Sequence, residues 1–419
     1  MLTWLANAWR VPELRRRVLF TGLILALYRL GSWVPAPGID QDAIENFFSS
    51  GGRGAGIFGL LNTFSGQALS RFSLFALGIM PYVTASIILQ LMTVVVPTLE
   101  RLQKEGEAGY AKINQYTRYL TVGLAAAQST GYAILFKRSG ALNANTGRLV
   151  LIVVTLTAGT TLLMWLGELI TKRGIGNGIS LLIFASILSS IPTGITAWLN
   201  GGTLERLFLP LIALGVIVAV VYIQEGQRRI PIQYAKRMVG RRQTAGGSTY
   251  MPLRVNMAGV IPVIFAAAVM ALPPTVASFF PSTQSFVNQH FQFNSLPYLS
   301  FEAFLIVVFT YFYTAVQFNP VDQAENLRKY GGYVPGIRPG PPTAQYLDRV
   351  MTRLTLPGSL YLALVAVLPG IFIHYFNFSQ ATARALGGTS VLIVVGVALD
   401  TMRQMESQMM MRSYEGFLK

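Results

Sequence analysis

The sequence contains no cysteine and little charge. Of its 419 residues, 12% are charged and 52% are hydrophobic, whereas soluble domains carry about 25% charged residues. The lack of cysteine excludes disulfide bonds, thiolate metal sites and cysteine-bound iron–sulfur clusters. The scarcity of charge argues against a water-soluble fold and indicates a chain that folds by packing helices in lipid.

Long apolar windows recur along the chain, each near the roughly 20 residues that a helix needs to cross a bilayer. They predict ten transmembrane helices, at residues 18–36, 72–96, 119–136, 149–170, 179–199, 206–223, 257–280, 301–318, 354–375 and 389–402. The first window has no small-residue cleavage site, so we expect it to remain as a helix. Two shorter apolar stretches, 57–64 and the proline-broken 273–299, are not expected to span.

Basic residues indicate the orientation. With the N-terminus inside and ten crossings, 25 of the 33 Lys and Arg residues face the cytoplasm and seven face outside. This asymmetry follows the positive-inside rule and predicts that both termini are cytoplasmic. Arg29 lies near the outer end of the first predicted helix, and we expect its side chain to extend to the interface.

Two cytoplasmic loops are longer than simple connections. Residues 224–255 alternate in polarity around the basic sequence GRRQTAGG, which predicts a projecting hairpin. Residues 319–353 are rich in Gly and Pro and place Arg338 on a turn between Gly336 and Gly340.

The large basic loop after the sixth predicted helix divides the chain into two halves of five helices. We expect residues 1–200 and 201–405 to form these halves, with a cytoplasmic tail at 406–419. Because each half has an odd number of helices, the halves must have inverted topology, an arrangement that places a pathway between them.

Five long motifs cover nearly the whole chain in order. They are FSGQALSRFSLFALGIMPYVTASIILQLM at 64–92, MWLGELITKRGIGNGIS at 164–180, GQRRIPIQYAKR at 226–237, VNMAGVIPVIFA at 255–266 and GIRPGPPTAQYLDRVMTRLTLPG at 336–358. Together they closely resemble the bacterial SecY family. The resemblance implies an all-α polytopic protein of the cytoplasmic (inner) membrane, in which two inverted five-helix halves surround a central protein-conducting pore.

The resemblance also implies an aliphatic constriction of six residues: Ile79, Val83, Ile179, Ile183, Ile264 and Ile393. Branched apolar side chains hold no water or ions in a narrow pore, yet make no directional bonds to a chain that slides through. Ile79 and Val83 are four residues apart and share one helix face, and Ile179 and Ile183 likewise share a face of their own helix. Without the resemblance, ordinary helix packing or lipid contact would explain these residues.

The short apolar stretch resembles the plug of that family, over about residues 55–67. Its apolar members are Ile57, Phe58, Leu60, Leu61 and Phe64. Glycines on both sides predict a short helix with flexible ends. The alternative is a re-entrant or interfacial segment with a purely structural role.

The family opens sideways between helices two and three and helices seven and eight. The matching polar positions are Gln90 and Asn256, and simple structural hydrogen bonding is the alternative role. The resemblance further assigns Arg241, Arg242 and Arg338 to docking of the ribosome and the SecA motor. It implies SecE and SecG as partner subunits, signal sequences and nascent chains as clients, and contact with membrane lipid.

No enzymatic motif is present. The sequence has neither G-x-x-x-x-G-K-[ST] nor H-E-x-x-H, and His290 and His374 have no ligand partners at metal spacing. We therefore predict no catalytic residues, no cofactor and no metal. The energy for transport must then come from the motor, the ribosome or the proton-motive force.

Two other functions remain open. A secondary transporter would also suit inverted halves, but such proteins carry buried charges near the midplane, and this chain has almost none in its predicted spans. A scaffold without a pathway is a more distant alternative. Among charged residues near helix ends, we expect a Glu168–Lys172 pair and an Asp400–Arg403 pair.

Overall fold

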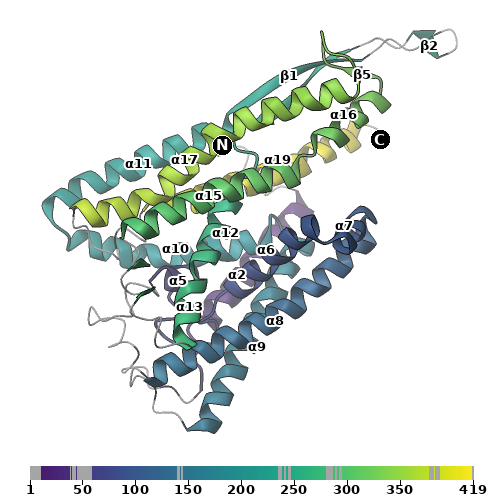
Figure 1. The fold of residues 1–419 in the computed structure, drawn as a ribbon. Coiled ribbons are helices and arrows are strands. Elements are labelled where there is room, and N and C mark those ends of the chain that lie inside the picture. Colours follow the sequence, from purple (N-terminus) through teal and green to yellow (C-terminus); the bar gives the residue numbers. More distant parts are fainter. Residues whose placement is uncertain are drawn as a thin grey trace.

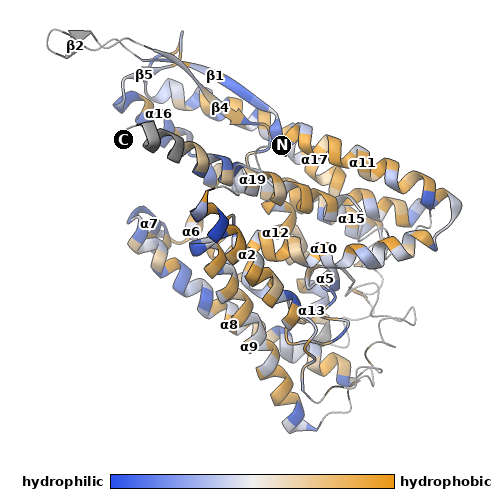
Figure 2. Cartoon of the chain, turned by 180° about the vertical axis from the view of Figure 1, so that it is seen from behind, coloured by the Kyte–Doolittle hydropathy of each residue, from blue (hydrophilic) through white to orange (hydrophobic). Residues whose placement is uncertain are grey.

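The chain folds into a helical body with a small β-sheet at one end (Figure 1). The structure is a computed structural model that describes residues 11–37, 59–138, 145–234, 238–239, 242–243, 247–279, 295–376 and 387–417, with residues 39, 44, 142, 286, 287, 290, 291 and 382. Figure 2 shows that the helical body is largely hydrophobic, whereas the sheet and α16 carry hydrophilic residues.

The first part of the chain contributes seven helices that the structure describes. They are α2 (Pro12–Gly31), α5 (Gly59–Phe64), α6 (Met80–Val95), α7 (Pro97–Lys104), α8 (Glu107–Arg138), α9 (Thr146–Arg173) and α10 (Gly178–Leu199). Asn177 caps α10 by accepting a 3.0 Å hydrogen bond from the Ile179 amide.

The second part carries the remaining described helices and the strands. The helices are α11 (Thr203–Glu225), α12 (Ile261–Met270), α13 (Leu272–Phe279), α15 (Leu296–Gln317), α16 (Pro320–Lys329), α17 (Pro341–Phe376) and α19 (Gly388–Phe417). The strands are β1 (Gln227–Tyr234), β2 (Met238–Val239), β3 (Arg242–Gln243), β4 (Ser248–Arg254) and β5 (Gly332–Tyr333).

Each of the ten predicted spans coincides with a helix or a broken pair of helices, but several boundaries differ. The span predicted at 72–96 begins only at Met80, because the preceding residues form turns in which Phe72 and Gly78 have positive φ angles of 45° and 58°. The span predicted at 257–280 is interrupted between α12 and α13, where Pro273 and Pro274 occupy the first turn of α13. Proline is tolerated there because a first-turn amide needs no helical acceptor.

Fewer of the described helices pass a test of length and hydropathy for membrane spans than the ten that the apolar windows predict. Among the described residues, five helices are long and apolar enough to cross a membrane, or six if the bent pair α6 and α7 is one span. The helices α2 and α8 are long as well, but they carry basic residues such as Arg17 and Arg118. The described helices are compatible with ten crossings, and the number itself remains a prediction.

The predicted hairpin is confirmed by the pairing of the strands. β1 and β4 are antiparallel, with Gln227 opposite Arg254 and Gln233 opposite Ser248. β5, from the second long loop, pairs with the other edge of β1. The two loops therefore form one three-stranded sheet, which projects beyond the helices near the C-terminal end of α19 (Figure 1).

The apolar core joins elements from both parts of the chain. Figure 1 shows α8 and α9 on one side of the molecule, α11, α15 and α17 on the other, and α10 and α12 between them. One cluster of buried side chains includes Ile79 of the α6 N-terminus, Ile183 of α10, Ile264 of α12 and Ile393 of α19. The middle of the molecule is therefore packed with aliphatic side chains.

Candidate functional site

The six predicted constriction residues lie in the interior. Five of them, Ile79, Val83, Ile183, Ile264 and Ile393, are at most 4% exposed. The sixth, Ile179, is half-buried and packs against the same cluster. Their side chains therefore contact protein rather than lie on the lipid-facing surface.

The helices that carry these residues are in mutual contact. α6 packs against α12, and α10 packs against α19. At Gly167 of α9, an added Cβ would lie 3.6 Å from Ile79 Cδ1 and 3.8 Å from Ile179 Cγ1. The structure thus brings the side chains at 79 and 179 together against a residue that has no side chain of its own.

The predicted plug contains a short helix, α5. Leu61 and Phe64 are buried, with 9% and 3% of their surfaces exposed, and the helix contacts α10. Leu60 is described only for its backbone, and Ile57 and Phe58 lie outside the described residues.

The segment after α5 is held by polar contacts that the sequence did not predict. The Tyr28 hydroxyl donates to the Ser65 carbonyl at 3.1 Å and lies 2.6 Å from Ser186 Oγ. Arg29 Nη1 donates to the Gly66 carbonyl at 3.1 Å, a contact that the sequence did not predict, and its extension to the interface stays a prediction. No sequence motif joins residues that are 37 and 158 positions apart, so only the fold reveals this tether.

The two predicted lateral-gate residues differ in their surroundings. Gln90 of α6 is half-buried. Asn256 is 5% exposed and precedes α12 rather than opening it. Its side-chain nitrogen donates to the Gly259 carbonyl at 3.0 Å, which caps the turn that leads into the helix.

Two of the three predicted docking residues belong to the described part of the two long loops. Arg338 is exposed between Gly336 and Gly340, whose φ angles of 81° and 106° are accessible mainly to glycine. Arg242 begins β3 and is described only for its backbone, and Arg241 lies outside the described residues.

Charged pairs connect neighbouring helices at the sheet side. Glu168 does not pair with Lys172 as predicted, because Arg118 of α8 donates to both carboxylate oxygens, at 2.8 and 2.5 Å. The predicted Asp400–Arg403 pair is confirmed at 3.4 Å. Arg403 also donates to Glu225 Oε1 at 2.7 Å.

Helix α7 is bent by 98° from α6 and is fully polar on its exposed face. Lys104 donates to Glu100 Oε1 at 2.7 Å and holds the pKa of that carboxyl below its usual value. Since both groups are exposed, this pair contributes little to stability.

Buried carboxyl groups occur near helix ends rather than in the middle. Glu205 and Glu302 are 5% and 4% exposed, and they lie within the first two turns of α11 and α15. Within the described part of the chain, no group of three or more His, Asp or Glu side chains could hold a metal ion. These described carboxyl groups therefore do not provide the midplane charge that a secondary transporter would need.

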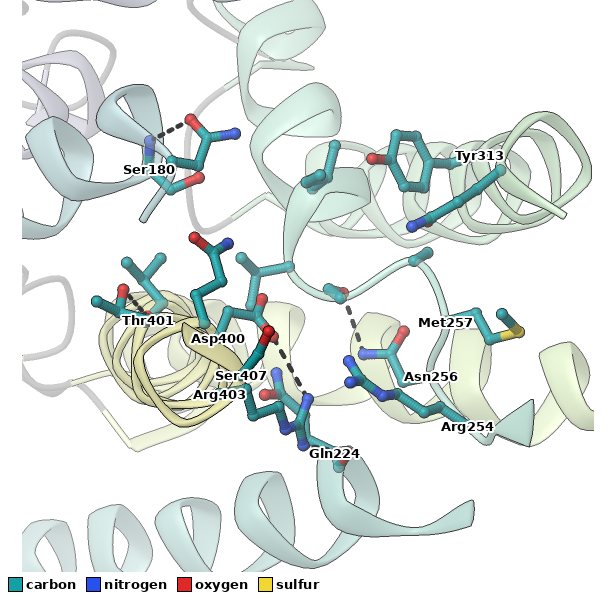
Figure 3. A pocket seen from close by; sticks show the side chains of 18 residues that line it. Ser180, Gln224, Arg254, Asn256, Met257, Tyr313, Asp400, Thr401, Arg403 and Ser407 are labelled. Atoms are coloured by element: carbon teal, nitrogen blue, oxygen red, sulfur yellow. Dashed lines mark hydrogen bonds and ion pairs between the residues drawn. The ribbon is translucent and has the colours of Figure 1, made fainter. Parts of the chain in front are cut away.

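A polar cavity of about 400 Å³ lies on the sheet side of the aliphatic cluster. Its walls come from the start of α10, the end of α11, the segment before α12, the end of α15 and the middle of α19. Figure 3 shows Gln224, Asn256, Asp400 and Arg403 around it. The sequence gave no signal for this cavity, since its residues come from five separate elements.

Comparison with known proteins gives consistent results. The model of the SecY family matches residues 73–402. Protein translocase subunit SecY of Streptomyces coelicolor is 48% identical over 445 residues, and that of Mycobacterium tuberculosis H37Rv is 46% identical over 441 residues, with complete coverage of both chains in each case.

Solved structures share the fold at lower identity. A structure described as that of a protein conducting channel is 20% identical, with a TM-score of 0.64 over 93% of this chain and 91% of the other. Sec61 in a canine ribosome-channel complex is also 20% identical, with a TM-score of 0.59 over the same shares of both chains.

Proposed function

Since this chain belongs to the SecY family, we propose that it is the channel subunit of a protein translocase, through which unfolded secretory chains cross the membrane. The relatives named above are translocase subunits, and they match over their full length. The chain is a multi-pass membrane protein, and its fold is that of protein-conducting channels.

The central pathway runs between residues 1–200 and 201–405. The observation that carries this proposal is the interior position of the six aliphatic residues, five of them buried and Ile179 half-buried, which come from four helices distributed over both halves. A dry aliphatic collar, formed by Ile79, Val83, Ile179, Ile183, Ile264 and Ile393, blocks ions at rest and offers no charge that would hold a moving chain.

Residues 55–67 act as the plug that closes the pathway at rest. Burial of Leu61 and Phe64 against α10 supports this role. Membrane segments of client proteins leave sideways where α6 faces α12, between the regions of Gln90 and Asn256. Close packing of those two helices supports this exit.

The two long cytoplasmic loops form the docking surface for the ribosome and for SecA, through Arg338 and through Arg241 and Arg242 of the basic sequence GRRQTAGG. Sec61, a neighbour in fold, was solved in a ribosome-channel complex, and guanidinium groups suit both phosphate and carboxylate partners. SecE and SecG complete the complex, and signal sequences are its ligands.

The protein lies in the cytoplasmic (inner) membrane with both termini in the cytoplasm. The excess of Lys and Arg on the predicted inner side supports this orientation. The subunit is a passive pore rather than an enzyme, and the motor, the ribosome or the proton-motive force supplies the energy.

Substitution of the collar tests the channel. We expect Ile183→Ser together with Ile264→Ser to raise the ion conductance of the resting protein in lipid vesicles severalfold, because hydroxyl groups let water enter the constriction. Leu211→Ser, at a position of α11 that is 66% exposed, is the matched control and should leave conductance unchanged.

Two results would contradict this function. Unchanged conductance in the double variant, with retained uptake of a small solute, would favour a secondary transporter. Failure of a stalled secretory chain to cross-link to a probe at position 79 would favour a scaffold without a pathway.

A further inference from the structure

The polar cavity shown in Figure 3 is lined by two buried amide side chains with atoms that have no hydrogen-bond partner among the described residues. Gln224 and Asn256 are 3% and 5% exposed. Among the described residues, neither Oε1 nor Nε2 of Gln224 has a hydrogen-bond partner, and Oδ1 of Asn256 has none. Because buried polar atoms are almost always hydrogen-bonded, the contents of the cavity must supply these bonds.

The charged groups of the cavity are largely engaged with one another. Arg403 donates to Asp400 Oδ1 at 3.4 Å, to Glu225 Oε1 at 2.7 Å and to the Gln224 carbonyl at 2.8 Å. The remaining hydrogen-bonding capacity at the buried wall therefore belongs to neutral amides. Arg254 also lines the cavity, but it is exposed. The unpaired buried atoms are one amide nitrogen, of Gln224, and two amide oxygens, of Gln224 and Asn256, which match the C=O and N–H of peptide groups.

The room for Gln224 depends on a glycine. An added Cβ at Gly396 of α19 would lie 2.8 Å from Gln224 Nε2 and would collide with Val260. The helices α11 and α19 and the N-terminus of α12 therefore meet at this point, and the missing side chain leaves the amide accessible from the cavity.

The cavity lies next to the aliphatic cluster. Val260 and Val397 line the cavity and belong to that cluster. Ile264 lies four residues after Val260 on α12 and Ile393 lies four residues before Val397 on α19, which in each case is about 6 Å of helix rise. A chain that approaches the collar from the sheet side must pass these amides first.

We propose that this cavity is a binding site for the backbone of an extended polypeptide. The cavity holds the polypeptide just before the collar and so prevents it from slipping back when the driving partner releases it. The proposal rests on the channel function above. Its ligand is the peptide group itself, so it does not depend on the side chains of the client.

Back-slip of a stalled chain tests the site. The complete translocase, with its partner subunits and ATP-driven motor, is reconstituted in vesicles with a secretory chain that a folded C-terminal domain arrests. After ATP removal, protease protection measures the rate at which the chain leaves. We expect Gln224→Leu and Asn256→Leu each to increase that rate by about 3- to 10-fold, because each variant loses one or two hydrogen bonds to the client backbone.

A second measurement changes the client polypeptide. A client whose arrested segment consists of proline has no backbone N–H to donate to Asn256 Oδ1. We expect this client to leave the wild type and Asn256→Leu at the same rate. Gln115→Leu removes an exposed amide of α8 outside the cavity and should change neither rate.

The outcomes separate the inference from the function. Normal forward transport with equal back-slip in the wild type and both variants would overturn the backbone site while leaving the channel intact. A proline-rich client that still distinguishes the wild type from Asn256→Leu would also overturn it. Absence of any protected client with the wild type would instead contradict the channel function.

Discussion

At the scale of single residues, Glu168 shows how tertiary neighbours replace local ones. Its spacing from Lys172 on one helix favours an i,i+4 pair, which is worth only a few tenths of a kcal/mol. The fold instead places Arg118 of α8 opposite it, and the guanidinium binds both carboxylate oxygens. A bidentate pair is stronger than a flexible surface pair, so Glu168 binds across the helix interface.

Glu168→Gln should destabilise the folded protein by about 1 kcal/mol, since Arg118 is partly exposed and water replaces some of the lost interaction. Thermal unfolding in detergent micelles would measure the change. Lys172→Gln is the matched control on the same helix and should leave the unfolding temperature unchanged. A larger loss of stability in Lys172→Gln than in Glu168→Gln would favour the Glu168–Lys172 pair and contradict the Arg118–Glu168 contact.

At the scale of elements, α5 is too short to be stable alone, since isolated helices need about 12–15 residues. Its position depends on neighbours, chiefly the packing against α10 and the Tyr28 contacts to Ser65 and Ser186. The Tyr28 ring also stacks on Phe75 with centroids 5.8 Å apart. The hydrogen bonds of the Tyr28 hydroxyl can therefore be removed without removing the packing of its ring.

Tyr28→Phe keeps the ring and removes both hydrogen bonds, which should favour the open plug. The bond to Ser65 is the one that joins the proposed plug segment, and at about 1 kcal/mol its loss should increase the open fraction by roughly 5-fold. Ion conductance of the resting protein in planar bilayers would report the change. Tyr375→Phe, at a position that is 64% exposed, should conduct like the wild type.

The plug tether would be refuted by a Tyr28→Phe variant whose resting conductance equals that of the wild type, provided that its unfolding temperature shows that it is folded. Ser186→Ala offers an independent check, because it removes one of the two contacts and should give a smaller increase.

At the scale of the whole molecule, one β-sheet combines two loops that are far apart in sequence. β5 adds to the edge of the β1–β4 hairpin, and Arg338 follows on a loop between two glycines of positive φ. The sheet joins the two loops into one unit, and it packs through Ile230 and Leu253 against Leu347 and Val350 of α17, which suits a docking surface for a large partner.

Arg338→Ala should weaken binding to the ribosome and lower the slope of log affinity against log salt by about one, if the guanidinium contacts a phosphate. Co-sedimentation over a range of salt concentrations would measure both quantities. Arg148→Ala is a control with the same loss of charge, since Arg148 is exposed in the first turn of α9, at the helix end opposite the sheet. Equal affinities for Arg338→Ala and the wild type at every salt concentration would exclude this contact.

The sequence by itself determined the membrane class, the approximate positions of the helices and the hairpin, and its family motifs supplied the six aliphatic positions as candidates. Hydrophobic length and turn chemistry are local properties, and the family motifs are continuous stretches. The tertiary structure alone decided the Arg118–Glu168 pair, the Tyr28 tether and the cavity at Gln224, because each joins residues at least 37 positions apart. Such contacts depend on how helices approach one another, and no local pattern encodes that approach.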